Sequence, residues 1–284
     1  MTSPERKQNT LRPVTYTVSD LTGPEPGAVA GLAERVEKLV APDTWRRAGG
    51  RGTIEAAPGV LKVVQTDAVH YQILTFCEKL RTARRMPLRS RHDPGKFALA
   101  TRSDRARAKL SQPVTANFHE PTALARVVPD LEELSGTKIL IDWLALSAQG
   151  LSPQLKGSLK VDGRPLSEAL DELLSPLGLA YRVVDADTLE ITTPKVLAAR
   201  LELEFYPLGD LLTEGMTASS ILGQIQDQVA GATWSEAGGP GLLDLDGPSD
   251  CLIVLQSQPV QFALEALLQR WRAEKTPENK AGKP

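Results

Sequence analysis

Residues that commonly perform covalent or acid–base catalysis are scarce in this chain. It contains three histidines and two cysteines among 284 residues. A catalytic cysteine needs a histidine nearby to activate its thiol, and the sequence spacing supplies none for Cys77 or Cys251. His119 is followed directly by Glu120, and this pair could transfer a proton, but an exposed loop histidine is the commoner explanation. The sequence therefore predicts that the protein is not an enzyme.

No cofactor or metal ion is predicted. Neither cysteine has a second cysteine or a histidine at metal-ligand spacing. Asp185 and Asp187 flank a predicted turn, where aspartate is common, and lack the spacing of a calcium loop. Both cysteines are expected to be buried apolar thiols.

The charge balance gives the whole chain no attraction to polyanions. Thirty-three Lys and Arg residues face 35 Asp and Glu residues, for a net charge of −2, so neither nucleic acid nor an acidic membrane is an expected partner. No apolar run approaches the ~20 residues that span a bilayer. Residues 86–110 are the exception, because they are rich in arginine. We expect a solvated linker there, with residues 103–110 a candidate short helix, and a contact with nucleic acid or phospholipid is the alternative.

Two segments near opposite ends of the chain share residues in register, residues 40–52 and 229–241. Each has a Thr-Trp pair followed by a glycine-rich turn. The candidate signature positions are Trp45, Gly49, Gly50, Gly52, Trp234, Gly238, Gly239 and Gly241. Gly49, Gly50 and Gly52 are expected to supply positive φ angles before a hairpin. Each tryptophan either fills a core or forms an exposed anchor for a partner, and the low aromatic content favours the core.

The similarity between the two ends extends to a helix in each. Apolar residues recur at one 3.6-residue spacing in both helices, at Val69, Ile73, Phe76, Cys77 and Leu80 and at Val260, Leu264, Leu267, Leu268 and Trp271. Upstream of the first helix, residues 14–18, 54–56 and 60–65 read as strands and residues 28–40 as a helix. Each end therefore predicts the order strand, helix, strand, strand, helix.

Residues 113–193 do not match the repeat and predict a third module. Strands are expected at 114–118, 138–142, 157–161, 181–184 and 189–192, and helices at 124–134 and 166–174. Pro129 inside the first helix predicts a kink or an early first turn. The predicted fold class is α+β, with three small sandwich modules in the order βαββα, βαββαββ, βαββα.

The length agrees with two or three domains. The predicted domains are residues 13–85, a first repeat module; 86–110, the linker; 111–195, the middle module; 203–274, a second repeat module; and 275–284, a disordered tail.

The middle module resembles the short N-terminal domain of bacterial secretins and TonB-dependent transducers, the STN or secretin N0 type. The resemblance is carried by residues 114–118, 134–136, 139–142, 159–161, 165–174, 177–182 and 188–191. The two flanking modules are similar to the KH-like N1 modules of secretins, on the pattern Leu-x-Val-x-Gln-Thr at residues 61–66 and the helices at Val69 and Val260. The arrangement also resembles uncharacterised planctomycete-type envelope proteins with the same Trp and Gly-Gly signatures.

This resemblance implies a non-enzymatic interaction and assembly module, similar to the periplasmic N-domains of secretins, that mediates protein–protein contacts in an envelope-associated complex. It implies protein partners, self-association and a place in the periplasm or cell envelope. The first ten residues contain no secretory signal, so the cytoplasm is the alternative. Candidate contact surfaces are the strand edges at residues 15–18 and 203–206.

Nucleic-acid binding through the KH-like modules is the alternative function. Residues 49–52 read Gly-Gly-Arg-Gly and match the Gly-x-x-Gly loop with which KH modules clamp a nucleic-acid backbone. A KH loop joins two helices, whereas this one precedes a predicted strand. The second copy, residues 238–241, lacks the basic residue.

Overall fold

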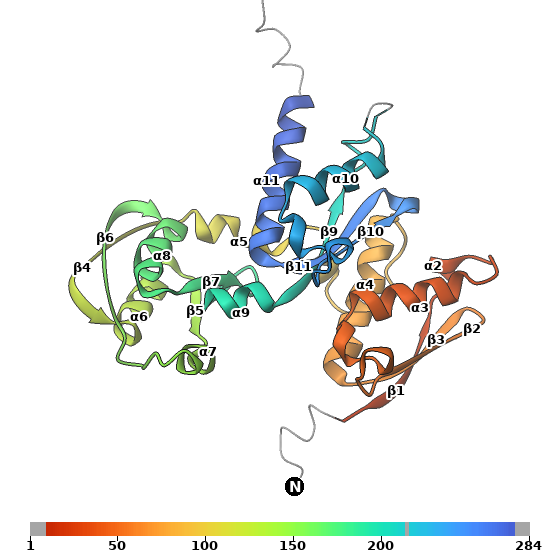
Figure 1. The fold of residues 1–284 in the computed structure, drawn as a ribbon, viewed down its shortest axis with the longest axis horizontal. Coiled ribbons are helices and arrows are strands. Elements are labelled where there is room, and N and C mark those ends of the chain that lie inside the picture. Colours follow the sequence, from red (N-terminus) through yellow and green to blue (C-terminus); the bar gives the residue numbers. More distant parts are fainter. Residues whose placement is uncertain (1–9, 214–215, 276–284) are drawn as a thin grey trace, which may run out of the picture. The chain divides into compact units, whose positions relative to one another are not determined.

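A computed structural model describes residues 10–213 and 216–275, which form two compact units (Figure 1). The first unit contains the chain up to Leu99 together with Phe205–Leu212 and Leu242–Leu255. The second contains Ala100–Glu204, Thr213–Gly241 and the chain from Gln256 onward. The predicted disordered tail lies outside the described residues, except for Lys275.

A three-stranded antiparallel sheet organises the start of the first unit. It consists of β1 (Arg12–Thr17), β2 (Thr53–Ala57) and β3 (Val60–Gln65) in the order β1-β3-β2. Alternate residues of β3, Leu61 and Val63, are buried and Lys62 between them is exposed, because successive side chains of a strand point to opposite faces. The sheet therefore buries one face, and β1 is an edge strand.

Three helices accompany this sheet in the first unit, α2 (Ser19–Thr22), α3 (Ala28–Leu39) and α4 (Asp67–Ala83). The Thr66 hydroxyl accepts the N–H of Val69 and caps α4. Helix α3 is amphipathic, with buried Leu32, Val36 and Leu39. Helix α4 is buried all round from Phe76 to Arg81, which indicates that it is covered on more than one side.

A second sheet provides that additional cover. It consists of β9 (Leu201–Pro207), β10 (Leu242–Asp246) and β11 (Cys251–Ser257) in the order β10-β11-β9. The Phe205 ring lies 6.0 Å from the Phe76 ring, and Lys79 Nζ lies 5.4 Å from the Phe205 centroid. The apolar contact and the cation–π contact hold α4 against β9 within the first unit.

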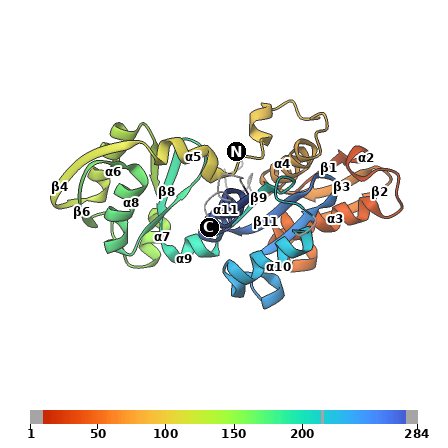
Figure 2. The same ribbon diagram turned by 90° about the horizontal axis from the view of Figure 1, so that it is seen from above.

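Two small sheets enclose the main core of the second unit (Figures 1 and 2). Strands β4 (Pro113–Ala123) and β6 (Lys156–Pro165) form an antiparallel pair. Strand β8 (Thr188–Thr192) runs parallel to β5 (Lys138–Ile141) and antiparallel to β7 (Ala180–Val183).

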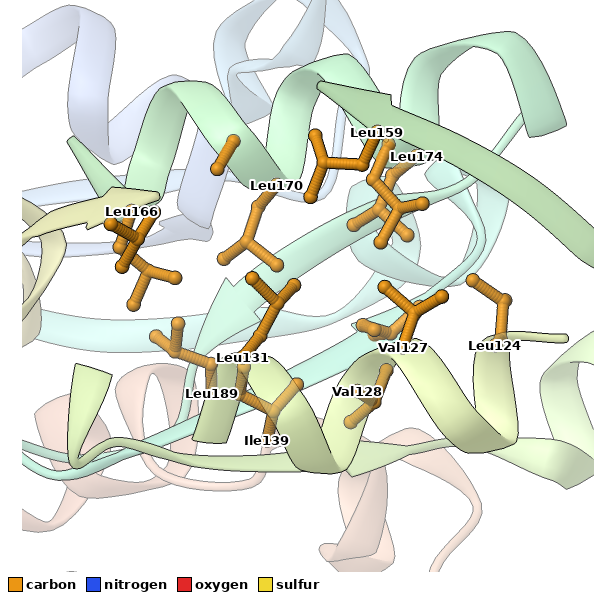
Figure 3. Close-up of a cluster of buried hydrophobic side chains, with 14 of the residues drawn as sticks. Leu124, Val127, Val128, Leu131, Ile139, Leu159, Leu166, Leu170, Leu174 and Leu189 are labelled. Atoms are coloured by element: carbon orange, nitrogen blue, oxygen red, sulfur yellow. The ribbon is translucent and has the colours of Figure 1, made fainter. Parts of the chain in front are cut away.

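The core between these sheets is aliphatic, and α6 (Leu124–Ser135) and α8 (Leu166–Leu174) are its two largest contributors. Figure 3 shows Val127 and Leu131 of α6 pointing toward Leu170 and Leu174 of α8. Gly136, at φ +59°, ends α6 in the left-handed conformation. Pro129 lies inside the helix, which continues through it.

The remaining helices are α5 (Arg102–Leu110), α7 (Trp143–Ala148), α9 (Pro194–Ala199), α10 (Ala218–Gln228) and α11 (Gln258–Lys275). Residues 103–110 and 260–271 were predicted to be helical, and α5 and α11 confirm both predictions. Short 3-10 helices occupy Pro42–Thr44, Arg46–Ala48, Pro94–Phe97, Ser175–Leu177, Gly231–Thr233, Ser235–Ala237 and Gly247–Ser249. Helix α5 lies in the segment predicted to be a linker, and its Ala106 packs into the core of the second unit.

The α+β class of small modules is confirmed, and the predicted helix at 166–174 coincides with α8. Within the described parts of the chain, no helix combines the length and apolar character needed to cross a membrane.

Candidate functional site

The turns that contain Trp45 and Trp234 bury their tryptophan side chains. Trp45 and Trp234 are each 1% exposed. Their indole N–H groups donate to the carbonyls of Val40 and Val229, at 2.7 and 2.6 Å. A buried ring with a satisfied N–H cannot serve as an exposed anchor, so the core interpretation of both tryptophans holds.

The glycines of the first turn are required for two different reasons. Gly49 has φ +87°, as expected. The predicted positive φ is wrong for Gly50 and Gly52, whose φ angles lie outside that range. A Cβ at Gly50 would overlap the main chain of Thr44, and one at Gly52 would overlap the Gln65 side chain. Close approach of the chain to itself, rather than backbone angle, is what favours glycine there.

The second turn repeats this geometry. Gly238 has φ +85°, a Cβ at Gly239 would overlap Thr233, and one at Gly241 would overlap Gln256. Gln65 Nε2 donates to Thr44 Oγ1 at 2.7 Å, and Gln256 Nε2 donates to Thr233 Oγ1 at 2.9 Å.

The main-chain amides of these turns already have acceptors inside the protein. The N–H groups of Gly49, Gly50 and Gly52 donate to the carbonyls of Arg46, Trp45 and Thr44. The corresponding amides of Gly238, Gly239 and Gly241 donate to Ser235, Trp234 and Thr233. A loop that clamps a phosphate backbone must present free N–H groups, and these six amides are not available for that purpose.

The histidines and cysteines do not gather into a site. His70 is buried, with Nδ1 2.8 Å from Tyr16 Oη and Nε2 2.8 Å from the Arg12 carbonyl. His119 and Glu120 are exposed on β4. Burial raises the pKa of the Cys77 and Cys251 thiols to about 12. In residues 10–213 and 216–275, no group of three His, Cys, Asp or Glu side chains is placed to hold a metal ion.

A groove lies between the free edge of β1 and helix α4. It encloses a cavity of about 240 Å³, lined by Thr15, Tyr16, Thr17, Val18, Leu74, Cys77, Glu78, Arg81, Arg89 and Ser90. The predicted contact surface at residues 15–18 therefore borders a hollow. An edge strand beside a pocket can bind an extended segment through its main chain while the pocket receives a side chain.

The charges that line this groove are paired with one another. Arg81 bonds to Asp20 at 2.8 Å and to Glu78 at 2.9 Å. Glu78 also accepts the main-chain N–H groups of Arg89 and Ser90, at 3.0 and 3.1 Å. Burial raises the pKa of Asp20, but the hydrogen bond and charge of Arg81 outweigh it and lower that pKa. Because these charges neutralise one another, the groove is suited to an uncharged peptide segment.

The second predicted contact surface, at residues 203–206, is not exposed. Glu204, Phe205 and Tyr206 are at most 5% exposed. In the first unit α4 covers Phe205, through Phe76 and Lys79. The prediction of an exposed contact surface here is therefore wrong. Strand β9 is the last strand of its sheet, but other parts of the chain still cover its residues.

A buried aspartate holds α3 and α4 to β10 in the first unit. Asp246 Oδ2 accepts from Arg84 Nε at 2.9 Å and from Ser249 Oγ at 2.6 Å, and Arg35 Nη1 bonds to Asp246 Oδ1 at 3.1 Å. Burial alone raises the pKa of Asp246, but these three donors outweigh it and lower the pKa to about 2. No motif marks these residues, because Arg84 and Asp246 are 162 positions apart.

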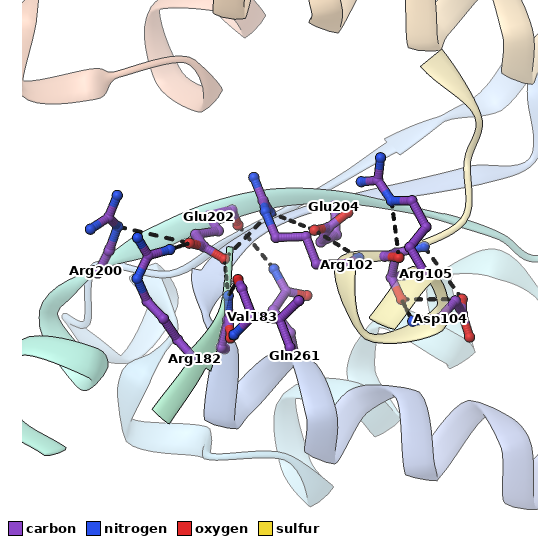
Figure 4. Close-up of polar contacts among 11 residues, drawn as sticks. Arg102, Asp104, Arg105, Arg182, Val183, Arg200, Glu202, Glu204 and Gln261 are labelled. Atoms are coloured by element: carbon purple, nitrogen blue, oxygen red, sulfur yellow. Dashed lines mark hydrogen bonds and ion pairs between the residues drawn. The ribbon is translucent and has the colours of Figure 1, made fainter. Parts of the chain in front are cut away.

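A second polar cluster belongs to the second unit (Figure 4). Arg102 of α5 bonds to Glu204 and lies 3.4 Å from Glu202 Oε2. Arg182 of β7 bonds to Glu202 at 3.1 Å, and Gln261 of α11 donates to the Glu202 carbonyl at 3.0 Å. The buried carboxylates are engaged by arginines, and Gln258 Nε2 also donates to Glu202 Oε2 at 2.6 Å. This arrangement ties α5, β7, β9 and α11 together.

No protein-family model and no curated protein matches this chain. Among solved structures it is similar to a chain of the GspC–GspD complex from the type II secretion system of enterotoxigenic Escherichia coli. The match has 17% identity, covers 56% of this chain and 97% of the other, and has a TM-score of 0.20. The N-terminal domain of the secretin XcpQ from Pseudomonas aeruginosa matches at 17% identity over 57% of this chain and 65% of its own, with a TM-score of 0.20.

The type IV competence pilus secretin PilQ of V. cholerae is also similar, at 16% identity and a TM-score of 0.23, over 55% of this chain and 37% of PilQ. This chain thus spans less than two thirds of XcpQ and of PilQ. Similarities at this level assign neither a family nor a function to the chain.

Proposed function

We propose that this chain is a non-enzymatic protein-interaction and assembly module that mediates protein–protein contacts in an envelope-associated complex. The observation that carries the proposal is the free edge of β1 beside the groove on α4. An edge strand presents unpaired main-chain groups, which bind other strands and need no catalytic side chain.

The internal construction of the first unit supports the same function. Helices α3 and α4 dock on β10 through the buried contacts of Asp246 with Arg35 and Arg84. Helices and sheet of this unit are therefore held together by buried polar contacts as well as apolar ones, which makes the unit a firm support for the exposed edge of β1.

The proposal includes the modular organisation. The chain would comprise two copies of one module at residues 13–85 and 203–274, a linker at 86–110 and a secretin N0-like module at 111–195. The matching bonds of Trp45 and Trp234 support the two copies, and the eight signature residues would have structural roles. The periplasm or cell envelope is the proposed location, on the sequence resemblance alone.

Site-specific photo-crosslinking in cells tests this function. A photoreactive amino acid is placed at Thr15, on the edge of β1, and at Leu144 of α7, which is 82% exposed. The matched control is Lys62, which lies opposite Thr15 in the central strand β3 and is also exposed. We expect discrete protein adducts from Thr15 or Leu144 and none from Lys62. Adducts to nucleic acid, or no protein adduct at either position, would overturn the proposal.

A further inference from the structure

The main-chain groups of β1 alternate between its partner strand and the free edge. Val18 N–H donates to the Gly59 carbonyl on the β3 side, at 2.9 Å. The Thr17 carbonyl instead accepts from Arg81 Nη2 at 3.2 Å and Arg89 Nη1 at 3.4 Å, so it points to the free edge. Because alternate residues of an antiparallel edge strand face outward, the outward residues are Pro13, Thr15 and Thr17.

These three residues offer an asymmetric set of donors and acceptors. Thr15 presents both an N–H and a carbonyl, Thr17 presents an N–H, and Pro13 presents a carbonyl. Pro13 has no N–H to donate, and the Thr17 carbonyl is already occupied by Arg81 and Arg89. The edge therefore lacks one donor at one end and one acceptor at the other.

We propose that the free edge of β1, beside the groove between β1 and α4, binds β1 of a second copy of this chain. The two strands pair antiparallel about a two-fold axis at Thr15. In that register Thr15 faces Thr15 of the second copy, and Pro13 faces Thr17 of the second copy. The Thr15 N–H groups donate to each other's carbonyls, and each Thr17 N–H donates to the opposite Pro13 carbonyl. Pro13 has no N–H to donate, and the Thr17 carbonyl that faces it already accepts from Arg81 and Arg89. Every outward main-chain group of Pro13, Thr15 and Thr17 therefore has a hydrogen-bond partner. The edge is self-complementary, as a two-fold interface requires.

The side chains fit the same register. Val14 and Tyr16 alternate with the outward residues and face α4, since they pair with the buried Val63 and Leu61. About the two-fold axis, Val14 lies opposite Tyr16 of the second copy. Val14 is a large apolar side chain that is exposed, at 37%, and Tyr16, Leu74 and Cys77 line the cavity beside it. Pairing would bury Val14 against an aromatic ring, a favourable cross-strand combination.

The inference rests on the proposed function, because it names the partner at the β1 edge. It joins two three-stranded sheets into one continuous sheet and removes an exposed edge from each copy.

Disulfide trapping of the full chain tests the pairing directly. In Thr15→Cys, the two Cα atoms would be about 5.5 Å apart in a hydrogen-bonded antiparallel pair, which is within the range that a disulfide can bridge. The matched control is Glu55→Cys, on the opposite edge strand β2, since Thr15 and Glu55 both lie opposite Lys62. The native thiols, Cys77 and Cys251, are buried. We expect Thr15→Cys to form a covalent dimer under mild oxidation and Glu55→Cys to remain monomeric.

Sedimentation equilibrium of the unmodified chain and of Val14→Asp provides the second measurement. We expect a reversible dimer, with a dissociation constant raised by about tenfold or more in Val14→Asp, because a charge would be buried against Tyr16. Circular dichroism checks that the variant keeps its fold. A strict monomer, or equal crosslinking of the two cysteine variants, would overturn the self-pairing. Adducts from Leu144 to a different protein would still support the proposed function in that case.

Discussion

In the turn after Trp45 the chain passes so close to itself that a methyl group at Gly50 would overlap the main chain of Thr44. The indole ring is buried, its N–H is bonded to Val40, and the neighbouring amides are bonded within the turn. The indole N–H and the glycine amides of the turn thus have acceptors inside the protein. Substitutions there should act on stability, and any effect on binding should follow from unfolding.

Gly50→Ala tests this directly, with Gly31→Ala as its control. The overlap at Gly50 forces the main chain to move and should lower the free energy of unfolding by about 1–3 kcal/mol. A Cβ at Gly31, inside α3, meets no atom and should raise the free energy by ~0.5–1 kcal/mol. Urea unfolding of the two variants measures both. Equal effects would contradict the explanation from close approach.

The two buried thiols give a second prediction at the residue scale. Because burial raises the pKa of Cys77 and Cys251 to about 12, almost no thiolate forms at neutral pH, and thiolate is the reactive species. We expect neither cysteine to react with an aromatic disulfide reagent in the folded protein and both to react in guanidinium. Rapid labelling of the native chain would show that one thiol is accessible.

At the scale of elements, Asp246 at the end of β10 connects helices whose residues are far away in sequence. Its carboxylate bonds to Arg84, which directly follows α4, and to Arg35 of α3, and its side chain is fully buried. Removing one partner from a buried pair leaves the other charge unsatisfied. The ionised carboxylate of Asp246 is therefore one attachment of α3 and α4 to the second sheet, beside the contact of Phe76 with Phe205 and the bond of Arg35 to Asp244 at 2.6 Å.

Acid should weaken this attachment in a defined pH range. The pKa of Asp246 is about 2 in the folded chain against an ordinary 3.8, so the unfolded chain binds the proton first as pH falls. The stabilisation, about 2 kcal/mol, is fully present above pH 4 and is lost as pH falls toward 2. Urea unfolding at pH 7 and pH 3 measures the loss.

Two variants complete this experiment. Asp246→Asn cannot ionise and should be destabilised at pH 7 and lose less further stability in acid than the natural chain. Asp227→Asn, at an exposed position of α10, should keep the full pH dependence. If Asp246→Asn and the natural chain lost the same amount between the two pH values, another carboxylate would be responsible.

At the scale of the whole molecule, the chain alternates between its two units. The first unit needs residues before 100 as well as Phe205–Leu212 and Leu242–Leu255. The main core of the second unit draws its buried residues from Ala106 to Ile191, a continuous stretch. Independent folding is therefore expected of the middle of the chain and not of its start.

Two fragments test this difference. Residues 100–200 contain every buried residue of the main core of the second unit. This fragment should unfold cooperatively and give dispersed amide signals in NMR spectra. Residues 10–99 lack β9 to β11, so Phe76 and Arg84 would lose Phe205 and Asp246. We expect that fragment to bind a hydrophobic dye and to self-associate. A cooperative, monomeric 10–99 fragment would show that the second sheet is dispensable.

Local structure was predictable because its signals are short in sequence. The apolar spacing of residues 166–174 specifies α8, and residues 60–65 specify β3, since each pattern repeats within a few residues. The strand at residues 15–18 was predictable for the same reason. Helices α7 and α9 were missed because six residues are too few to establish a period.

The sequence by itself determined the α+β elements, their order and the scarcity of catalytic side chains. Only the tertiary structure decided that arginines of residues 86–110 form ion pairs, with Arg89 on Asp20, Arg102 on Glu204 and Arg107 on Asp104. The tertiary structure also decided that the predicted edge at residues 15–18 is open and the one at residues 203–206 is covered. Helix and strand patterns repeat over neighbouring residues, whereas each ion pair selects one acid among 35, and that selection depends on packing between distant segments.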